Sequence, residues 1–190
     1  MRRGMLGRAP SPAYRLPQRG GPGRWLRAVV YAALLVAAQG LLSRLADAAG
    51  LPAPDLFLLT GAALAWRLNP AWALVAAYGV GLGQDLLGGG VLGLHAAGVA
   101  GGALLVLMIR RYFADSGIFQ AVLTVLSAVA GQWLVFGFLT YWLRSDLVTV
   151  KLLQATVPLL FVGTLLVFPL WERVVGWGFG PRSGAEENLS

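Results

Sequence analysis

The residues of this sequence that could carry chemistry lie together in one glycine-rich stretch. Residues 78–102 contain Gln84, Asp85 and His95 among ten glycines. A carboxylate and an imidazole can share a metal, relay a proton or bind backbone amides. The chain has no cysteine and no second histidine, so a metal site built from thiolates or several imidazoles is excluded. No paired catalytic groups occur elsewhere, and we expect no enzyme activity, no cofactor and no metal.

Asp85 has three interpretations that the sequence leaves open. It can be a charge tolerated near a membrane boundary, because the cost of a carboxylate is much smaller there than at the bilayer centre. It can hold a turn together by accepting hydrogen bonds from glycine amides. It can also contact a partner or substrate directly.

His95 has two interpretations, a packing residue or part of a proton relay. It lies beyond a predicted hairpin turn from Asp85, so the two side chains can interact. A relay normally needs further ionisable groups along the bilayer. Gln132 is the other polar residue expected nearby, and an amide does not titrate, which weakens the relay interpretation.

The glycines of this stretch predict a turn and two packing surfaces. Three consecutive glycines break the apolar pattern and predict the turn of a hairpin. Glycines four residues apart allow close contact between membrane helices. A formal G-x-G-x-x-G match is rejected as a dinucleotide motif, because it joins two apolar helices and follows no strand. The hairpin residues are Gln84, Asp85, Gly88, Gly89, Gly90, Leu92, Gly93 and His95, and the packing glycines are Gly79, Gly83, Gly98 and Gly102.

These residues must be positioned by helices in a membrane, because the composition excludes other classes. The 190 residues are 57% hydrophobic and 12% charged, with a mean hydropathy of +0.70. Soluble domains carry about 25% charged residues. The sequence therefore predicts an all-α integral membrane protein. It excludes a soluble, a disordered or a nucleic-acid-binding protein, despite a pI near 10.8.

Six apolar runs predict a bundle of six transmembrane helices. The runs cover 28–45, 56–66, 71–87, 91–109, 118–143 and 152–175, with kinks expected at Pro158 and Pro169. The second run, which follows Pro52 and Pro54, has only 11 residues. It is either a short or tilted span or a re-entrant half-helix. The predicted domain covers residues 28–176, followed by a short cytoplasmic tail, 177–190.

The charges predict which side of the membrane each loop occupies. With six spans both termini lie on one side, and twelve of the fifteen basic residues fall on that side. The other three are Arg44, Arg144 and Lys151. Because basic residues favour the cytoplasm, we expect both termini to be cytoplasmic. This uneven distribution of basic residues between the two sides is lost if the second run does not cross the membrane.

Residues 1–27 predict a disordered basic arm. They hold seven arginines and four prolines and too little apolar surface to fold. The arm either only fixes orientation or also contacts anionic lipid or an acidic partner.

The stretch from Gly79 to Gly98 resembles the signature region of the bacterial rod shape-determining protein MreD family. That family has a glycine-leucine stretch, then Gln-Asp, a small-residue turn and Leu-Gly-Leu-His. These elements correspond to residues 83–86, 88–90 and 92–95 of this sequence. Pro54-Asp55 and Asn69-Pro70 also resemble the family, and length and span number agree from about residue 26 to 176. The arginine-rich arm departs from the family pattern.

The resemblance implies a non-catalytic subunit of the bacterial cell-wall elongation complex in the cytoplasmic (inner) membrane. Its implied partners are MreC, the filament protein MreB, and the glycosyltransferase RodA with its class B penicillin-binding transpeptidase, beside membrane lipids. The family's fold is also similar to the six-helix substrate-binding subunits of energy-coupling-factor transporters. The alternative is therefore a membrane subunit that captures a small solute.

Overall fold

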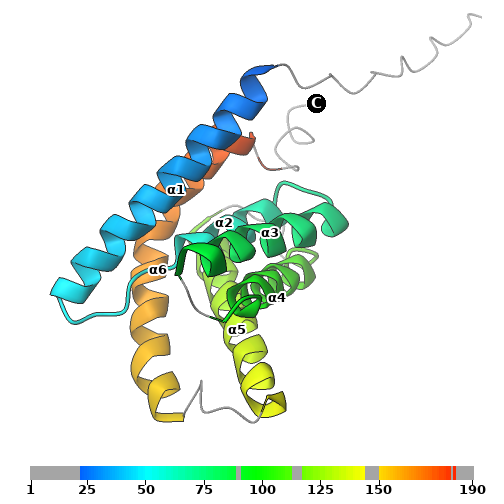
Figure 1. Ribbon diagram of the computed structural model, residues 1–190. Coiled ribbons are helices and arrows are strands. Elements are labelled where there is room, and N and C mark those ends of the chain that lie inside the picture. The colour runs from blue at the N-terminus through cyan, green and yellow to red at the C-terminus, as the bar shows by residue number, and fades with distance from the viewer. Residues whose placement is uncertain (1–21, 89–90, 113–116, 144–149, 181, 183–190) are drawn as a thin grey trace, which may run out of the picture.

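The computed structural model describes residues 22–88, 91–112, 117–143, 150–180 and 182, and these residues form six α-helices without a strand (Figure 1). The fold is all-α, as predicted. The helices are α1 (Pro22–Ala48), α2 (Leu56–Ala65), α3 (Pro70–Gly88), α4 (Leu94–Ile109), α5 (Ile118–Trp142) and α6 (Val150–Phe179).

The short helix α2 forms the centre of the molecule. All ten of its residues are buried, and each of the other five helices contacts it. A segment that is apolar on every face needs such surroundings. Its Thr60 hydroxyl lies 2.7 Å from the Tyr31 hydroxyl of α1 and accepts a hydrogen bond from the Trp171 indole of α6 at 3.0 Å. Polar contacts therefore join α1 and α6 to the core.

Three of the six helices are long and apolar enough to cross a membrane, by length and composition. They lie in α1, α5 and α6, over Trp25–Ala48, Ile118–Trp142 and Leu153–Phe179. At 1.5 Å per residue, α2 extends only about 15 Å, half of a hydrocarbon core. The non-helical segment 49–55 leads into it. α6 runs through both of its prolines as one helix.

The two ends of the chain differ from the predicted boundaries. α1 begins at Pro22, so the last six residues of the predicted arm are helical. Proline is favoured in the first turn of a helix because its missing N–H has no partner there anyway. Residues 1–21 of that arm lie outside the described residues. At the other end α6 reaches Phe179, and Arg182 of the tail packs against the protein.

The hairpin of α3 and α4 has clear start and stop signals. The Asn69 side chain accepts a hydrogen bond from the Trp72 amide at 3.0 Å, with Pro70 in the first helical position. α3 ends at Gly88. α4 begins after Gly93, whose φ of +92° is a left-handed conformation that favours glycine. Gly89 and Gly90 lie outside the described residues.

Glycines bring the backbones of neighbouring helices together, but not all at the predicted positions. An added Cβ would come within 3.0 Å of a neighbouring atom at Gly98 and Gly102, which face α5. It would meet nothing within 4 Å at Gly79 or Gly83, so these two glycines make no close helix contact among the described residues, and their packing role stays a prediction. Gly81 makes the close contact instead, because it faces the backbone of α4, where the Ala96 Cα lies 2.6 Å from such a Cβ.

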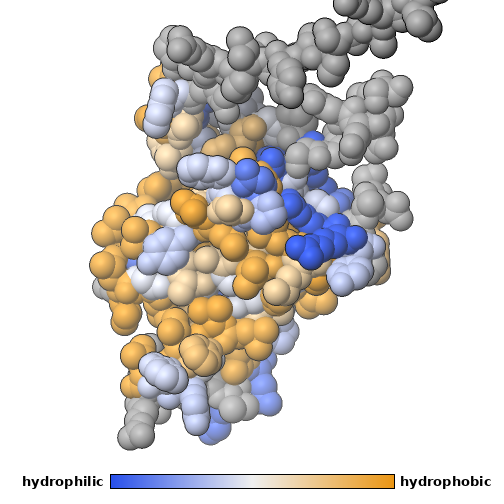
Figure 2. Space-filling view, turned by 90° about the vertical axis from the view of Figure 1, so that its right-hand side faces the viewer, coloured by the Kyte–Doolittle hydropathy of each residue, from blue (hydrophilic) through white to orange (hydrophobic). Residues whose placement is uncertain are grey.

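The surface of the molecule matches a membrane environment. In Figure 2 hydrophobic residues cover most of one face, and hydrophilic residues gather in a band across its upper part and at its lower tip. Many large apolar side chains are exposed, among them Leu86, Leu134 and Leu166. Exposed apolar surface on this scale is unusual for a soluble monomer.

Candidate functional site

Asp85 lies on α3, and its side chain caps the amino end of the neighbouring helix α4. Its carboxylate accepts hydrogen bonds from the backbone amides of Gly93 at 2.8 Å, His95 at 3.0 Å and Ala96 at 3.1 Å. These amides belong to the first turn of α4, where backbone N–H groups have no partner within the helix. A negative charge is also favoured at this end of a helix dipole. Of the three interpretations, the geometry matches the one that holds the turn, and one glycine amide takes part.

His95 adds a fourth hydrogen bond to the same carboxylate. Its ring Nδ1 lies 2.8 Å from Asp85 Oδ1, and the ring packs edge-to-face on Phe136 of α5. Because the carboxylate already accepts three N–H groups, it acts as an acceptor towards the ring, and Nδ1 carries the hydrogen. About a third of the His95 side chain is exposed, whereas the Asp85 side chain is fully buried.

Asp55 closes the amino end of α2 in the same way. Its Oδ1 accepts a hydrogen bond from the Leu58 amide at 2.9 Å, which is a standard N-cap. Its Oδ2 lies within hydrogen-bond distance of two side-chain amides, Gln132 at 3.0 Å and Gln84 at 3.4 Å. Asp55 is buried, so these contacts replace the water that a carboxylate would otherwise bind.

Gln39 of α1 makes hydrogen bonds with backbone groups of the segment that leads into α2. The Gln39 amide group donates to the Pro54 carbonyl at 3.0 Å and accepts from the Leu56 amide at 2.8 Å. Pro52 and Pro54 have no N–H group that needs a partner. Non-helical backbone within a membrane protein is tolerated where its polar groups are satisfied in this way.

The opposite end of α2 is closed by cations. The Arg67 guanidinium donates to the Ala63 carbonyl at 2.9 Å, and Arg110, the residue directly after α4, donates to the carbonyls of Ala65 and Leu68. Positive charge is favoured at the carboxyl end of a helix, where the last carbonyls lack partners. Both ends of the central helix are therefore closed by charged side chains.

One carboxylate balances two of the arginines at this end. Glu172 of α6 pairs with Arg67 at 2.6 Å and with Arg182 at 2.9 Å. Arg182 also donates to Gln120 of α5 at 2.8 Å and lies over the Trp66 ring. The cluster joins α2, α5, α6 and the tail.

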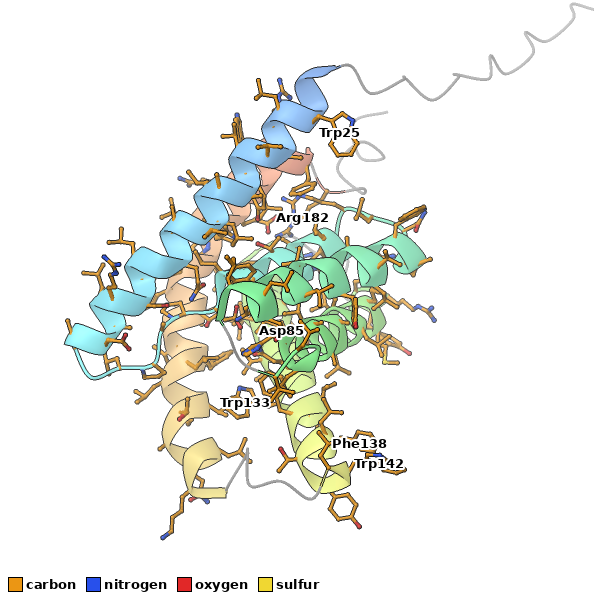
Figure 3. The ribbon with its side chains drawn as sticks, in the orientation of Figure 1. Trp25, Asp85, Trp133, Phe138, Trp142 and Arg182 are labelled. Carbon is orange, nitrogen blue, oxygen red and sulfur yellow. The ribbon has the colours of Figure 1, made fainter. Side chains whose placement is uncertain are left out.

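The predicted hairpin residues are brought together in part. Figure 3 shows Asp85 among the helices, well inside the molecule. Gln84 reaches Asp55, and Gly93 and His95 reach Asp85. Leu92 is exposed, and Gly88 ends α3.

The central role of Asp55 was missed by sequence analysis. Asp55 entered only through the Pro54-Asp55 pair, although an aspartate directly before an apolar run is a recognisable N-cap signal. Gln39 and Gln132 gave no such signal, because their partners lie on other helices.

The arrangement leaves little for chemistry on a bound molecule. Both carboxylates already accept three or more hydrogen bonds from the protein. Among the residues that the structure describes, no three histidine, aspartate or glutamate side chains form a metal-binding group. No protein-family model, curated protein or solved structure matches the chain.

Proposed function

We propose that this protein is a non-catalytic membrane scaffold of the bacterial cell-wall elongation complex, which binds MreC and works beside MreB, RodA and its transpeptidase. Its helices provide surfaces for partners, and its polar interior maintains the fold. In this proposal the chain lies in the cytoplasmic membrane with six passes and both termini in the cytoplasm.

The observation that carries the proposal is that the two aspartates buried in the described part of the chain, Asp55 and Asp85, both bind groups of the protein itself. In transporters, broken helices direct their amino ends at an anionic substrate in the membrane. This chain has two such ends, those of α2 and α4, and its own Asp55 and Asp85 occupy them. A solute would have to displace a carboxylate from three or four hydrogen bonds. The geometry therefore favours a scaffold over a solute-binding subunit.

The resemblance to the MreD family gains support from the same contacts. The residues that carry it, Pro54-Asp55, Gln84-Asp85 and the segment from Leu92 to His95, include both aspartates and their partners. A sequence pattern that coincides with a set of buried hydrogen bonds is what a shared structural requirement produces.

The six-pass arrangement is supported by the position of the caps. Asp85, which caps the amino end of α4, lies 15 residues after the start of α3, so it is about 22 Å along the helix from that end. Arg67 and Arg110, which close the far end of α2, lie at the end where α1 begins and α6 finishes. Basic residues at one end agree with a cytoplasmic orientation of both termini.

Depletion of the protein in its native host tests this function. We expect the cells to widen and become round while uptake of small solutes is unchanged. Cells that keep their rod shape but require an added vitamin or other solute would favour the transporter alternative.

A further inference from the structure

A cavity opens where α1 begins and α6 ends. Its volume is about 720 Å³, which lies within the range of small-molecule sites. Figure 1 shows these two helix ends at the same end of the molecule, and Figure 3 shows Trp25 there, near the start of α1. Three glycines between residues 176 and 180 line the cavity, together with the side chains of Trp25, Arg27, Ala28, Leu68, Trp177 and Phe179.

Glycines at the end of α6 keep this space open. Gly178 packs on the Tyr31 ring of α1, where an added Cβ would lie 3.0 Å from a ring carbon. The Tyr31 ring also contacts the Phe179 ring, with centroids 5.0 Å apart. Gly180 has a φ of +91°, a left-handed conformation that favours glycine. The two walls are therefore joined by close contacts, and the glycines bring no side chain into the space beside them.

The polar side chains that line the cavity select a ligand rich in acceptor atoms. In the described part of the chain they are the Arg27 guanidinium and the indoles of Trp25 and Trp177, and these groups can only donate hydrogen bonds. All three side chains are exposed. Arg27 forms no ion pair with another described residue, whereas Glu172 of α6 is already shared by two other arginines. An anion with several oxygens complements this lining.

The carbonyls at the end of α6 are partly satisfied by the protein itself. The last carbonyls of a helix lack partners and favour cations over anions. Here the Gly176 carbonyl accepts a hydrogen bond from the Gly180 amide at 2.9 Å. The Gly180 carbonyl accepts one from Arg67 Nε, also at 2.9 Å. A cation of the protein therefore offsets the negative end of this helix beside the cavity.

We propose that this cavity binds the headgroup of an anionic phospholipid, with the phosphate at Arg27 and the glycerol region against Leu68 and Phe179. Tryptophan is enriched at the level of lipid headgroups, where its N–H can donate while its ring stays in an apolar environment. Basic residues near a membrane surface attract anionic lipids. The apolar walls favour a lipid over a soluble phosphate. The inference goes beyond the proposed function and holds equally for a scaffold and for a transporter subunit.

Native mass spectrometry of the full-length protein in mild detergent tests this site, with phosphatidylglycerol, phosphatidylcholine and phosphatidylethanolamine added in turn. We expect one phosphatidylglycerol molecule to be retained at a lower concentration than either of the other lipids. Arg27→Gln should weaken this retention about fivefold, the effect of one basic contact at an anionic surface. Arg173→Gln is the matched control and should leave retention unchanged, because Arg173 is an exposed arginine of α6 outside the cavity lining.

A second variant fills the cavity without removing a charge. Ala28→Phe keeps Arg27 and places a ring in the space, so we expect a loss of retention at least as large. Unchanged retention in both Arg27→Gln and Ala28→Phe, or equal losses for Arg27→Gln and Arg173→Gln, would overturn the inference. Equal retention of the three lipids would also overturn it. Complete displacement of phosphatidylglycerol by an equimolar amount of free glycerol 3-phosphate would assign the site to a soluble phosphate instead.

Discussion

The two buried aspartates each cap the amino end of a helix, Asp85 that of α4 and Asp55 that of α2, but they bind different sets of hydrogen-bond donors. Asp85 accepts three backbone amides and an imidazole, and all of these groups can only donate in this arrangement. Asp55 accepts one backbone amide and two glutamine side chains. A glutamine amide can turn over and present its oxygen instead. The two sites should therefore respond differently to the loss of charge.

Asp85→Asn should destabilise the protein strongly. The asparagine oxygen cannot replace two carboxylate oxygens, and its NH₂ group would face N–H donors. We expect a loss of about 3 kcal/mol, which lowers the melting temperature in detergent by about 6–12 °C. Asp47→Asn is the control, because Asp47 is exposed on α1. Equal melting temperatures for the two variants would show that the cap contributes nothing.

Asp55→Asn should cost much less, within about 1 kcal/mol. Asparagine is an equally good N-cap residue, and its NH₂ group can donate to Gln84, whose buried oxygen has no partner among the described residues. Asp55→Ala removes both functions and should cost about 2–3 kcal/mol. Thermal unfolding of the two variants side by side checks this. A loss for Asp55→Asn as large as that for Asp55→Ala would mean that the charge itself is needed.

At the scale of elements, close packing depends on which face of α3 a glycine occupies. Gly81 faces the backbone of α4, whereas Gly79 faces away from the protein. Gly81→Ala forces two backbones apart and should cost about 1–3 kcal/mol. Gly79→Ala adds a methyl group to open space and should leave stability equal or slightly higher, because alanine favours helices. Chemical denaturation of the two variants in mixed micelles measures the difference, and equal stabilities would contradict this packing.

Sequence analysis could predict contacts between residues that are close in the chain. The α3–α4 hairpin was predictable from its glycines, and Asp85 could be paired with His95 because only ten residues separate them. Asp55 and Gln132 are 77 residues apart, and nothing in either segment shows that α2 and α5 meet. On α3 the close contact with α4 is made by Gly81, which lies on a different face from Gly79 and Gly83. Spacing alone does not say which face is buried.

At the scale of the whole molecule, Arg182 of the tail contacts residues at the ends of α2, α5 and α6. Arg182 contacts Glu172 of α6 and Gln120 of α5, and it lies over Trp66 next to α2. Arg182→Ala should lower stability by about 1–2 kcal/mol and increase hydrogen exchange at the ends of α2 and α6. Arg173→Ala, at an exposed position of α6, is the control. Exchange that is unchanged at those ends would show that the tail is not part of the folded unit.

The central claim is that this chain is a scaffold for partner helices, and co-purification from the native host in mild detergent, with mass spectrometry of the bound proteins, tests it most directly. The account predicts recovery of MreC together with RodA or its transpeptidase, and a weaker yield of them with Asp85→Ala. Recovery of a paired ATPase module with a transmembrane coupling subunit would contradict it and identify a transporter subunit.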